Sequence, residues 1–141
     1  MKTTAHIERI AELRSLAAFR QFLADECAGK PGVTGEVLYD LQLAVDEACT
    51  NIVIHGYESM EPGMIQLSLE FAPDRLTIEI ADQGRSFQPD RIPEPDISLP
   101  LEERSLGGMG LYLIHKSVDE VKYEARGDRN VMRLIKRLRP A

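Results

Sequence analysis

Apolar side chains recur along the chain at helical spacing in two N-terminal segments. The first segment spans residues 13–28, and Gly29 to Gly32 end it. The second begins after Thr34, a residue type that caps helices, and ends near residues 55–57. Its apolar stripe, with gaps of three and four residues, consists of Leu38, Leu41, Val45, Ala48 and Ile52. Three more apolar residues predict that this helix is covered on more than one side: Leu43, Ala44 and Ile54.

Strict alternation of apolar and polar residues predicts strands after the second helix. The first inward row contains Ile65, Leu67, Leu69 and Phe71. The next contains Leu76, Ile78 and Ile80, and the short connection between the two rows indicates an antiparallel hairpin. Further strands are expected over residues 4–10, 119–126 and 130–138.

Residues 83–107 interrupt these patterns. They contain four prolines, and a loop of this length in a compact domain is usually functional, for example as a lid. A third helix opens at Gly108. The order of elements therefore predicts an α+β fold, a two-layer sandwich with helices on one face of a mostly antiparallel sheet.

Composition narrows the class of protein. The 141 residues fit a single domain, over residues 1–141, and 23 acidic against 17 basic residues give a net charge of −6. This charge argues against direct binding of nucleic acid, and no apolar stretch or leader sequence indicates a membrane partner. Cys27 and Cys49 match no metal-ligand spacing and suit a reducing compartment. We therefore expect a cytoplasmic protein.

Asp82 is the first candidate for chemistry. It continues the inward parity of Leu76, Ile78 and Ile80, and a carboxylate on the core side of a strand is costly without a partner. Gly84 follows, where the backbone can approach a ligand closely. An Asp-x-Gly sequence also ends strands by capping its own turn, and for this feature alone the turn is the commoner explanation.

Glu47 and Asn51 form a second candidate. They are four residues apart and so share one face of the second helix, with Leu43 and Ile54 on the same side. A carboxylate and an amide in apolar company suit a proton acceptor and a neutral oxygen ligand for Mg²⁺. The plainer alternative is a surface pair near the end of a helix.

The third candidate is the glycine-rich sequence over residues 107–110, which contains Gly108, Met109 and Gly110. Its backbone N–H groups at a helix start suit an anion, although no Walker A lysine follows. A helix terminus contributes up to ~2 kcal/mol, whereas micromolar binding needs ~8 kcal/mol. Mg²⁺ near Asn51 and a base pocket at Asp82 would supply the remainder.

Together the three candidates, in this order along the chain, resemble the histidine-kinase-like ATPase superfamily with its Bergerat-type fold. The sequences DEACTNIVIHGY, IADQGRSFQP and ERSLGGMGLYLI (residues 46–57, 80–89 and 103–114) look most like those of bacterial anti-sigma factor serine/threonine kinases. The similarity extends over residues 5–138.

The resemblance implies a role for each candidate. Glu47 would be the general base that accepts the proton of the substrate hydroxyl, and Asn51 would coordinate Mg²⁺ on the phosphates of ATP. Asp82 would accept a hydrogen bond from the exocyclic amine of adenine, with Gly84 giving room beside the base.

The remaining roles concern the phosphates. The backbone of Gly108, Met109 and Gly110 would contact them, and residues from about 90 to 107 would be the ATP lid. Arg104 in the lid would approach the terminal phosphate. The sequence departs from wider relatives at Ser86, where histidine kinases often have glycine, and at Asn130, where many relatives have threonine.

As a whole, the resemblance implies an ATP-dependent kinase that phosphorylates an anti-sigma factor antagonist and sequesters a sigma factor, and it implies a homodimer. The alternative is a nucleotide-gated protein-binding switch without kinase activity, but a pure binder has no need of a base such as Glu47. A simple ATPase, or a kinase for a partner outside sigma regulation, is a third interpretation.

The C-terminal segment is strongly basic. We interpret its charges as protection of a terminal strand, with an acidic partner surface as the alternative. Residues 126–141 contain one acidic residue, Asp128, and six basic residues: Arg126, Arg129, Arg133, Lys136, Arg137 and Arg139.

Overall fold

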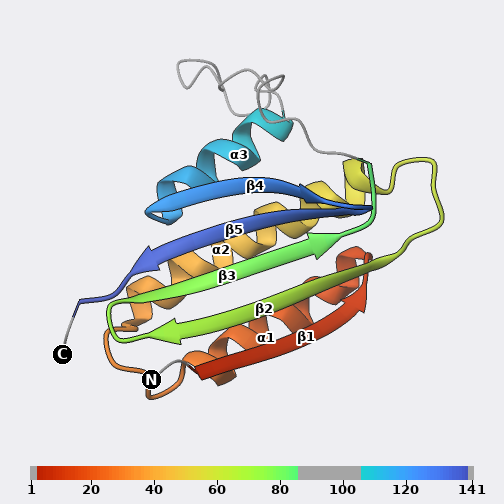
Figure 1. Ribbon diagram of the computed structural model, residues 1–141. Helices are drawn as coiled ribbons and strands as arrows, with labels where there is room; N and C mark the ends of the chain where they lie inside the picture. The colour runs from red at the N-terminus through yellow and green to blue at the C-terminus, as the bar shows by residue number, and fades with distance from the viewer. Residues whose placement is uncertain (1–2, 86–105, 140–141) are drawn as a thin grey trace.

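The computed structural model describes residues 3–85 and 106–139 of the chain (Figure 1). Its strands are β1 (Thr3–Ile10), β2 (Met64–Ala72), β3 (Arg75–Asp82), β4 (Glu120–Arg126) and β5 (Arg129–Arg137). Its α-helices are α1 (Leu16–Cys27), α2 (Gly35–Asn51) and α3 (Leu106–Ser117). A 3₁₀ turn, η1 (Leu13–Ser15), precedes α1, and a π-helical turn, η2 (Ile52–Gly56), follows α2.

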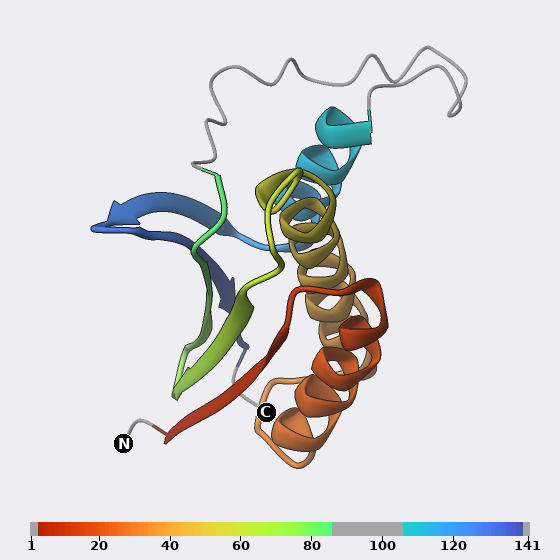
Figure 2. The same cartoon turned by 90° about the vertical axis from the view of Figure 1, so that its right-hand side faces the viewer.

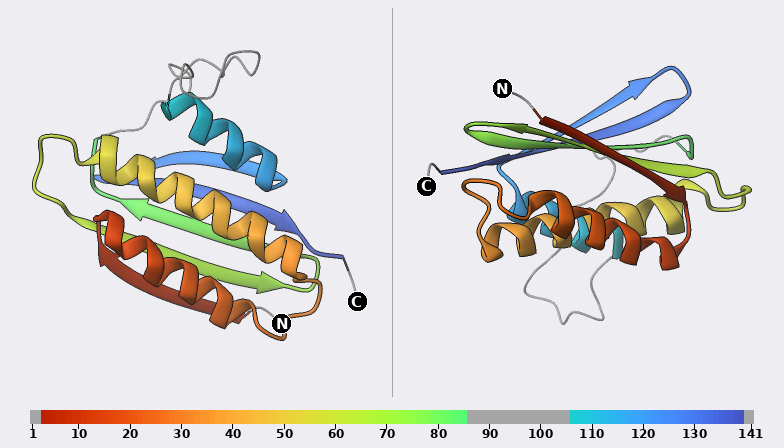
Figure 3. Two further views of the ribbon diagram at one scale, coloured as in Figure 1. Left: turned by 180° about the vertical axis from the view of Figure 1, so that it is seen from behind. Right: turned by 90° about the horizontal axis from the view of Figure 1, so that it is seen from below.

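The strands form one sheet in the order β1-β2-β3-β5-β4, and every neighbouring pair is antiparallel. All three α-helices lie against one face of this sheet, as Figures 2 and 3 show from the side, from behind and from below. Within residues 3–85 and 106–139, the other face carries no helix (Figure 3). The predicted α+β two-layer sandwich is therefore confirmed.

The core lies between the sheet and the helices. Both predicted inward rows are buried, from Ile65 to Phe71 on β2 and from Leu76 to Ile80 on β3. They meet Phe19 and Leu23 of α1, Ile114 of α3 and the stripe of α2. The inward side chains of β2 and β3 are long and apolar, and this face of the hairpin is buried against the helices.

The helix α2 forms the centre of the helical layer. The Thr34 Oγ1 accepts the Val37 N–H at 3.1 Å, so Thr34 is the predicted N-cap. Neighbouring helices cover α2 on two sides, and Ala44 is fully buried, as expected. Ile54 is 44% exposed, however, because it lies in η2 beyond the end of the α-helix.

The basic segment has a different setting from the one its charges suggested. The strand β5 lies between β3 and β4, so it is not an edge strand, and the interpretation as edge protection is wrong. Its cations instead form ion pairs within the fold. Arg133 pairs with Glu79 at 2.8 Å, and Lys136 pairs with Asp40 at 3.4 Å.

The segment from 86 to 105 lies outside the described residues, and with it Ser86, Arg104 and all of the expected lid except residues 106 and 107. The helix α3 begins at Leu106, two residues before the expected start at Gly108. Among the residues that the structure describes, no helix is long and apolar enough to cross a membrane. Cys27 and Cys49 are buried free thiols.

Candidate functional site

Glu47, Asn51 and Gly110 meet where the last turns of α2 face the beginning of α3. Both side chains of α2 are half-buried. A methyl group built on Gly110 would lie 3.0 Å from Glu47 Oε2 and 3.3 Å from Asn51 Nδ2. Glycine therefore lets α3 lie close to these two polar groups, and a Cβ atom would fill the cradle that Glu47, Asn51 and Gly110 form.

The environment of Glu47 favours the protonated carboxyl group. Burial is the main cause that raises its pKa, and the negative charge of Asp46 adds to the effect. Arg20 holds the Asp46 carboxylate with two hydrogen bonds, of 3.1 and 3.0 Å. A carboxylate with a raised pKa is a stronger proton acceptor, as general-base catalysis requires.

Asp82 lies at the end of β3, on the core side of the sheet, and is only 7% exposed. Its Oδ1 accepts the Gly84 N–H at 2.8 Å and the Asn130 Nδ2–H at 3.1 Å. The residue therefore caps its own turn and also continues the inward row, as both interpretations of the sequence expected. Within the described part of the chain, hydrogen bonds reach only Oδ1, which leaves Oδ2 for a ligand.

The pKa of Asp82 is raised by burial, while the hydrogen bonds from Asn130 and from the Gly84 N–H act in the opposite direction. A buried carboxylate that is supported on one oxygen is suited to accept a hydrogen bond from a neutral donor. An exocyclic amine is a donor of this kind.

Gly84 packs directly on Gly56, the last residue of η2. A Cβ atom at this position would clash with the Gly56 carbonyl, and the Arg85 N–H donates to the same oxygen at 2.6 Å. The requirement for glycine therefore comes from backbone packing. Since η2 follows Asn51 directly, this contact brings the Asp82 turn next to the end of α2.

Asn130 is a site residue that sequence reasoning left open. It lies directly opposite Asp82 in the register of β3 and β5. Its Nδ2 donates to Asp82 Oδ1, to the Gly84 carbonyl and to the Arg85 carbonyl, each at 3.1 Å. In the sequence, the only sign of this role is that Asn130 stands where many relatives have threonine. Its partner Asp82 follows from the register of β3 and β5, which a single sequence does not determine.

The glycine-rich sequence lies in the first turns of α3. Backbone N–H groups in the first turn of a helix have no acceptor within the helix, and the helix dipole places partial positive charge there. Gly108 and Met109 are therefore placed where an anion is favoured. Gly110 contributes through its missing side chain in front of Glu47 and Asn51.

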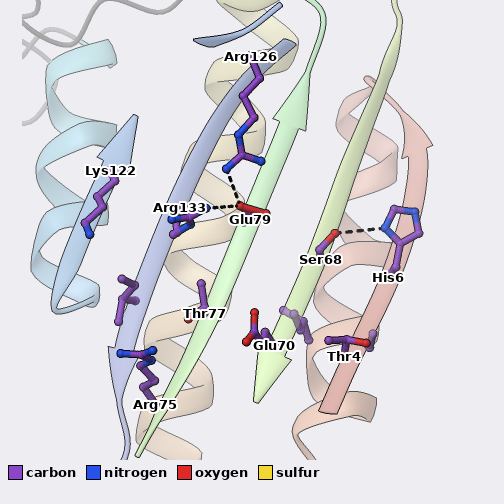
Figure 4. Close-up of a pocket in the computed structure, with 13 residues that line it drawn as sticks. Thr4, His6, Ser68, Glu70, Arg75, Thr77, Glu79, Lys122, Arg126 and Arg133 are labelled. Atoms are coloured by element: carbon purple, nitrogen blue, oxygen red, sulfur yellow. Dashed lines mark hydrogen bonds and ion pairs between the residues drawn. The ribbon is translucent and has the colours of Figure 1, made fainter. Parts of the chain in front are cut away.

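A hollow of about 740 Å³ on the opposite, helix-free face of the sheet contains none of these residues (Figure 4). Glu79 lies in it and binds Arg133 at 2.8 Å and Arg126 at 3.3 Å. The hydrogen bond from Arg133 is the main reason why the pKa of Glu79 is lowered. Two cations of this face therefore pair with a half-buried carboxylate, and the residues of the predicted site lie on the helical side.

Comparison with known proteins agrees with this geometry. The family model of the histidine kinase-like ATPase domain matches residues 10–136. A protein named serine-protein kinase RsbW from Halalkalibacterium halodurans is 39% identical over 99 residues, which are 67% of this chain and 60% of that protein. The protein of the same name from Bacillus cereus (strain AH187) is 34% identical over 126 residues, or 86% of this chain and 74% of the relative.

Solved structures share the fold at lower identity. The structure of the RsbU and RsbW domains of Rv1364c from Mycobacterium tuberculosis matches with a TM-score of 0.67 and 20% identity, over 99% of this chain and 34% of that one. The histidine kinase domain of a blue-light activated kinase from Erythrobacter litoralis matches with a TM-score of 0.58 and 16% identity, over 89% of this chain and 60% of that one.

The chain therefore belongs to the histidine kinase-like ATPase family, and the relatives named above carry the name serine-protein kinase RsbW. The match spans 60–64% of the length of relatives such as those from Halalkalibacterium halodurans and Bacillus velezensis.

Proposed function

We propose that the chain is an ATP-dependent protein serine/threonine kinase and an anti-sigma factor, which phosphorylates an antagonist protein and sequesters a sigma factor. One observation carries this proposal. The Glu47 carboxylate and the Asn51 amide meet Gly110 in the first turns of α3. The buried carboxylate of Asp82 lies beyond η2. The relatives named serine-protein kinase RsbW support the reaction type.

Glu47 accepts the proton of the substrate hydroxyl in this proposal. Its raised pKa makes it a better base than an exposed carboxylate. Phosphoryl transfer depends mainly on positioning and charge stabilisation, so a single well-placed base on a rigid helix suffices. Glycine at position 110 lets the backbone of α3 lie close to this base, so the start of α3 and Glu47 belong to the same part of the site.

Asn51 would hold Mg²⁺ through its amide oxygen. The residues fit this ion, because a neutral oxygen ligand beside an open cradle suits a cation that keeps several waters and binds phosphates. When bound, Mg²⁺ neutralises charge on the phosphates. The backbone of Gly108, Met109 and Gly110 would line the same side of the phosphates.

Asp82 would select adenine. Its Oδ2, to which no described residue donates a hydrogen bond, would accept the 6-amino group, and its Oδ1 is already held by Gly84 and Asn130. Guanine presents a carbonyl at the equivalent position. Two acceptors would then face each other, and a buried carboxylate without its donor is costly.

The partners in this proposal are an anti-sigma factor antagonist and a sigma factor, and the active form is a cytoplasmic homodimer. A nucleotide-gated switch without phosphoryl transfer remains the alternative function. The presence of Glu47 in the cradle favours the kinase, since binding alone requires no base.

Affinity capture from an extract of the native organism, with and without Mg²⁺ and ATP, tests the proposal. We expect two captured proteins, a sigma factor and a small antagonist that acquires phosphate on a serine or threonine when ATP is present. Capture that depends on ATP but yields no phosphorylated protein would support the switch. ATP hydrolysis without any sigma factor or antagonist would contradict the proposed partners.

A further inference from the structure

Tyr57 is a buried residue beside the turn that follows β3. It follows η2 directly, and its N–H bonds to the Ile52 carbonyl at 3.1 Å, which closes the π-helical turn. Its side chain is 6% exposed. Single π-helical turns of this kind are frequent at functional sites.

The Tyr57 hydroxyl makes two backbone hydrogen bonds. It accepts the Gln83 N–H at 2.9 Å and donates to the Met64 carbonyl at 3.2 Å. Gln83 is the residue between Asp82 and Gly84. Burial raises the pKa of Tyr57, and the nearby Asp82 charge adds to this effect, so the hydroxyl keeps the proton that it donates.

The turn after β3 is therefore anchored at three consecutive N–H groups. The Tyr57 hydroxyl accepts the Gln83 N–H and the Asp82 carboxylate accepts the Gly84 N–H. The Gly56 carbonyl accepts the Arg85 N–H. Two of the three acceptors, Gly56 and Tyr57, lie at the C-terminal end of η2. The third is the carboxylate itself, so its orientation depends on how firmly the turn is held.

Gly63 shows that this contact is built into the fold. A Cβ atom at this position would lie 2.6 Å from the Tyr57 hydroxyl oxygen and 2.9 Å from two ring carbons. The absence of a side chain at Gly63 lets the ring lie flush against the backbone that leads into β2. The Gly63 carbonyl in turn accepts the Ala11 N–H at 2.8 Å, which fixes the segment.

We propose that Tyr57 is a positioning residue for base recognition: its hydroxyl ties the turn that carries Asp82 to the C-terminal end of η2, which follows Asn51 directly. The base-binding and phosphate-binding parts of the site then move as one unit. This inference rests on the proposed role of Asp82 and adds a residue that does not contact the nucleotide.

The test compares binding of ATP with that of purine riboside 5′-triphosphate, which lacks the 6-amino group. The unmodified protein should bind ATP more tightly, by roughly 5- to 150-fold. Tyr57→Phe keeps the ring and removes only the hydroxyl, and we expect it to lower ATP affinity by about 2- to 10-fold. Binding of the analogue should change little, so the preference for ATP falls.

Two further variants separate positioning from general loss of stability. Gly63→Ala displaces the hydroxyl without removing it and should lower the preference as Tyr57→Phe does. Ile78→Val removes one buried methylene group on β3 away from the turn, and it should lower the melting temperature without changing the preference. An unchanged preference in Tyr57→Phe, or an equal loss in Ile78→Val, would overturn the inference.

Hydrogen exchange at the Gln83 amide keeps the inference separate from the proposed function. If the unmodified protein does not distinguish the two nucleotides, the role of Asp82 fails, and the exchange rate alone then decides whether Tyr57 holds the turn. We expect this amide to exchange at least about tenfold faster in Tyr57→Phe, as expected for loss of a hydrogen bond that opposes opening. An unchanged rate would contradict the proposed contact.

Discussion

Asp82 combines a functional demand with a cost in stability. Burial raises its pKa, so the folded protein binds this proton more tightly than the unfolded chain. By linkage, the contribution of Asp82 to stability falls as the pH rises through its raised pKa, and the ionised group is a burden at neutral pH. Such a carboxylate is typical of a site selected for binding.

Asp82→Asn tests this balance. The asparagine Oδ1 can still accept the hydrogen bonds from Gly84 and Asn130, while the buried charge is removed. We therefore expect a melting temperature at pH 7 equal to or above that of the unmodified protein, and a preference for ATP over GTP that falls from roughly 5- to 150-fold towards none. Calorimetry and nucleotide titration measure the two effects.

Asp128→Asn is the matched control, since Asp128 is exposed and contacts the neighbouring Gln83 side chain. It should leave the nucleotide preference unchanged. A clear drop in melting temperature for Asp82→Asn, with the ATP preference intact, would contradict the assignment of Asp82 to the base.

At the scale of elements, the glycines in the first turns of α3 lower the intrinsic stability of this helix. Glycine in a helix costs up to ~1 kcal/mol relative to alanine. Gly110 nevertheless lies in the helix, because a Cβ atom there would approach Glu47 Oε2 and the Asn51 amide. Glycine at position 110 therefore lowers the intrinsic stability of α3 and leaves the cradle unfilled.

Gly110→Ala should separate these two properties. Its folded state should be as stable as the unmodified protein or more stable by up to ~1 kcal/mol, since the side chain of Glu47 can move aside. ATP affinity should fall at least about tenfold, because a methyl group fills the cradle. Thermal melting and ATP titration measure the two properties.

Gly35→Ala provides the comparison for that variant. It places the same methyl group at the start of α2, where no neighbouring atom lies within 4 Å of the new Cβ. ATP binding should be unchanged in this control. If Gly110→Ala also binds ATP normally, the cradle is not part of the nucleotide site.

The elements themselves could be predicted where periodicity is strong. The inward rows of β2 and β3 and the cap at Thr34 follow from local spacing and residue type, and the structure confirms them. The π-helical turn η2 could not be predicted, since a 3.6-residue pattern does not mark where the winding changes.

Tertiary relations set the other limit of sequence reasoning. The interior position of β5 depends on strand order, and a run of cations looks the same on an edge strand as in cross-strand ion pairs. Asn130 lies opposite Asp82 only through the register of β3 and β5. The candidate residues could therefore be predicted individually from the sequence, whereas the residues that support them could not.

At the scale of the whole molecule, the two faces of the sheet have separate tasks. The helical face holds the core and the candidate site, and the open face is polar and contains the ion pairs of Glu79 (Figure 4). The net charge of −6 makes an anionic ligand unfavourable at long range. Local N–H groups and a bound cation must outweigh it, so nucleotide binding should require Mg²⁺.

The ion pairs of the open face predict a dependence of stability on pH. The hydrogen bond from Arg133 lowers the pKa of Glu79 below its usual 4.5. The resulting stability is present above the unfolded pKa and is lost as the pH falls through the lower folded value. Both side chains are about one-third exposed, which limits the contribution to about 1 kcal/mol.

Thermal melting of Glu79→Gln between pH 3 and pH 7 tests this dependence. The variant should melt a few degrees below the unmodified protein at pH 7, and the difference should disappear at the acid end. A difference that stays constant, or grows towards low pH, would show that Glu79 contributes through something other than its charge.

Phosphoryl transfer by Glu47→Gln, under single-turnover conditions with Mg²⁺, ATP and the captured antagonist, tests the central claim most directly. Glutamine keeps the size of the side chain and removes the base. We predict ATP affinity within about threefold of the unmodified protein and a transfer rate at least about 100-fold lower. Transfer at an undiminished rate, with ATP bound normally, would show that Glu47 is not the base.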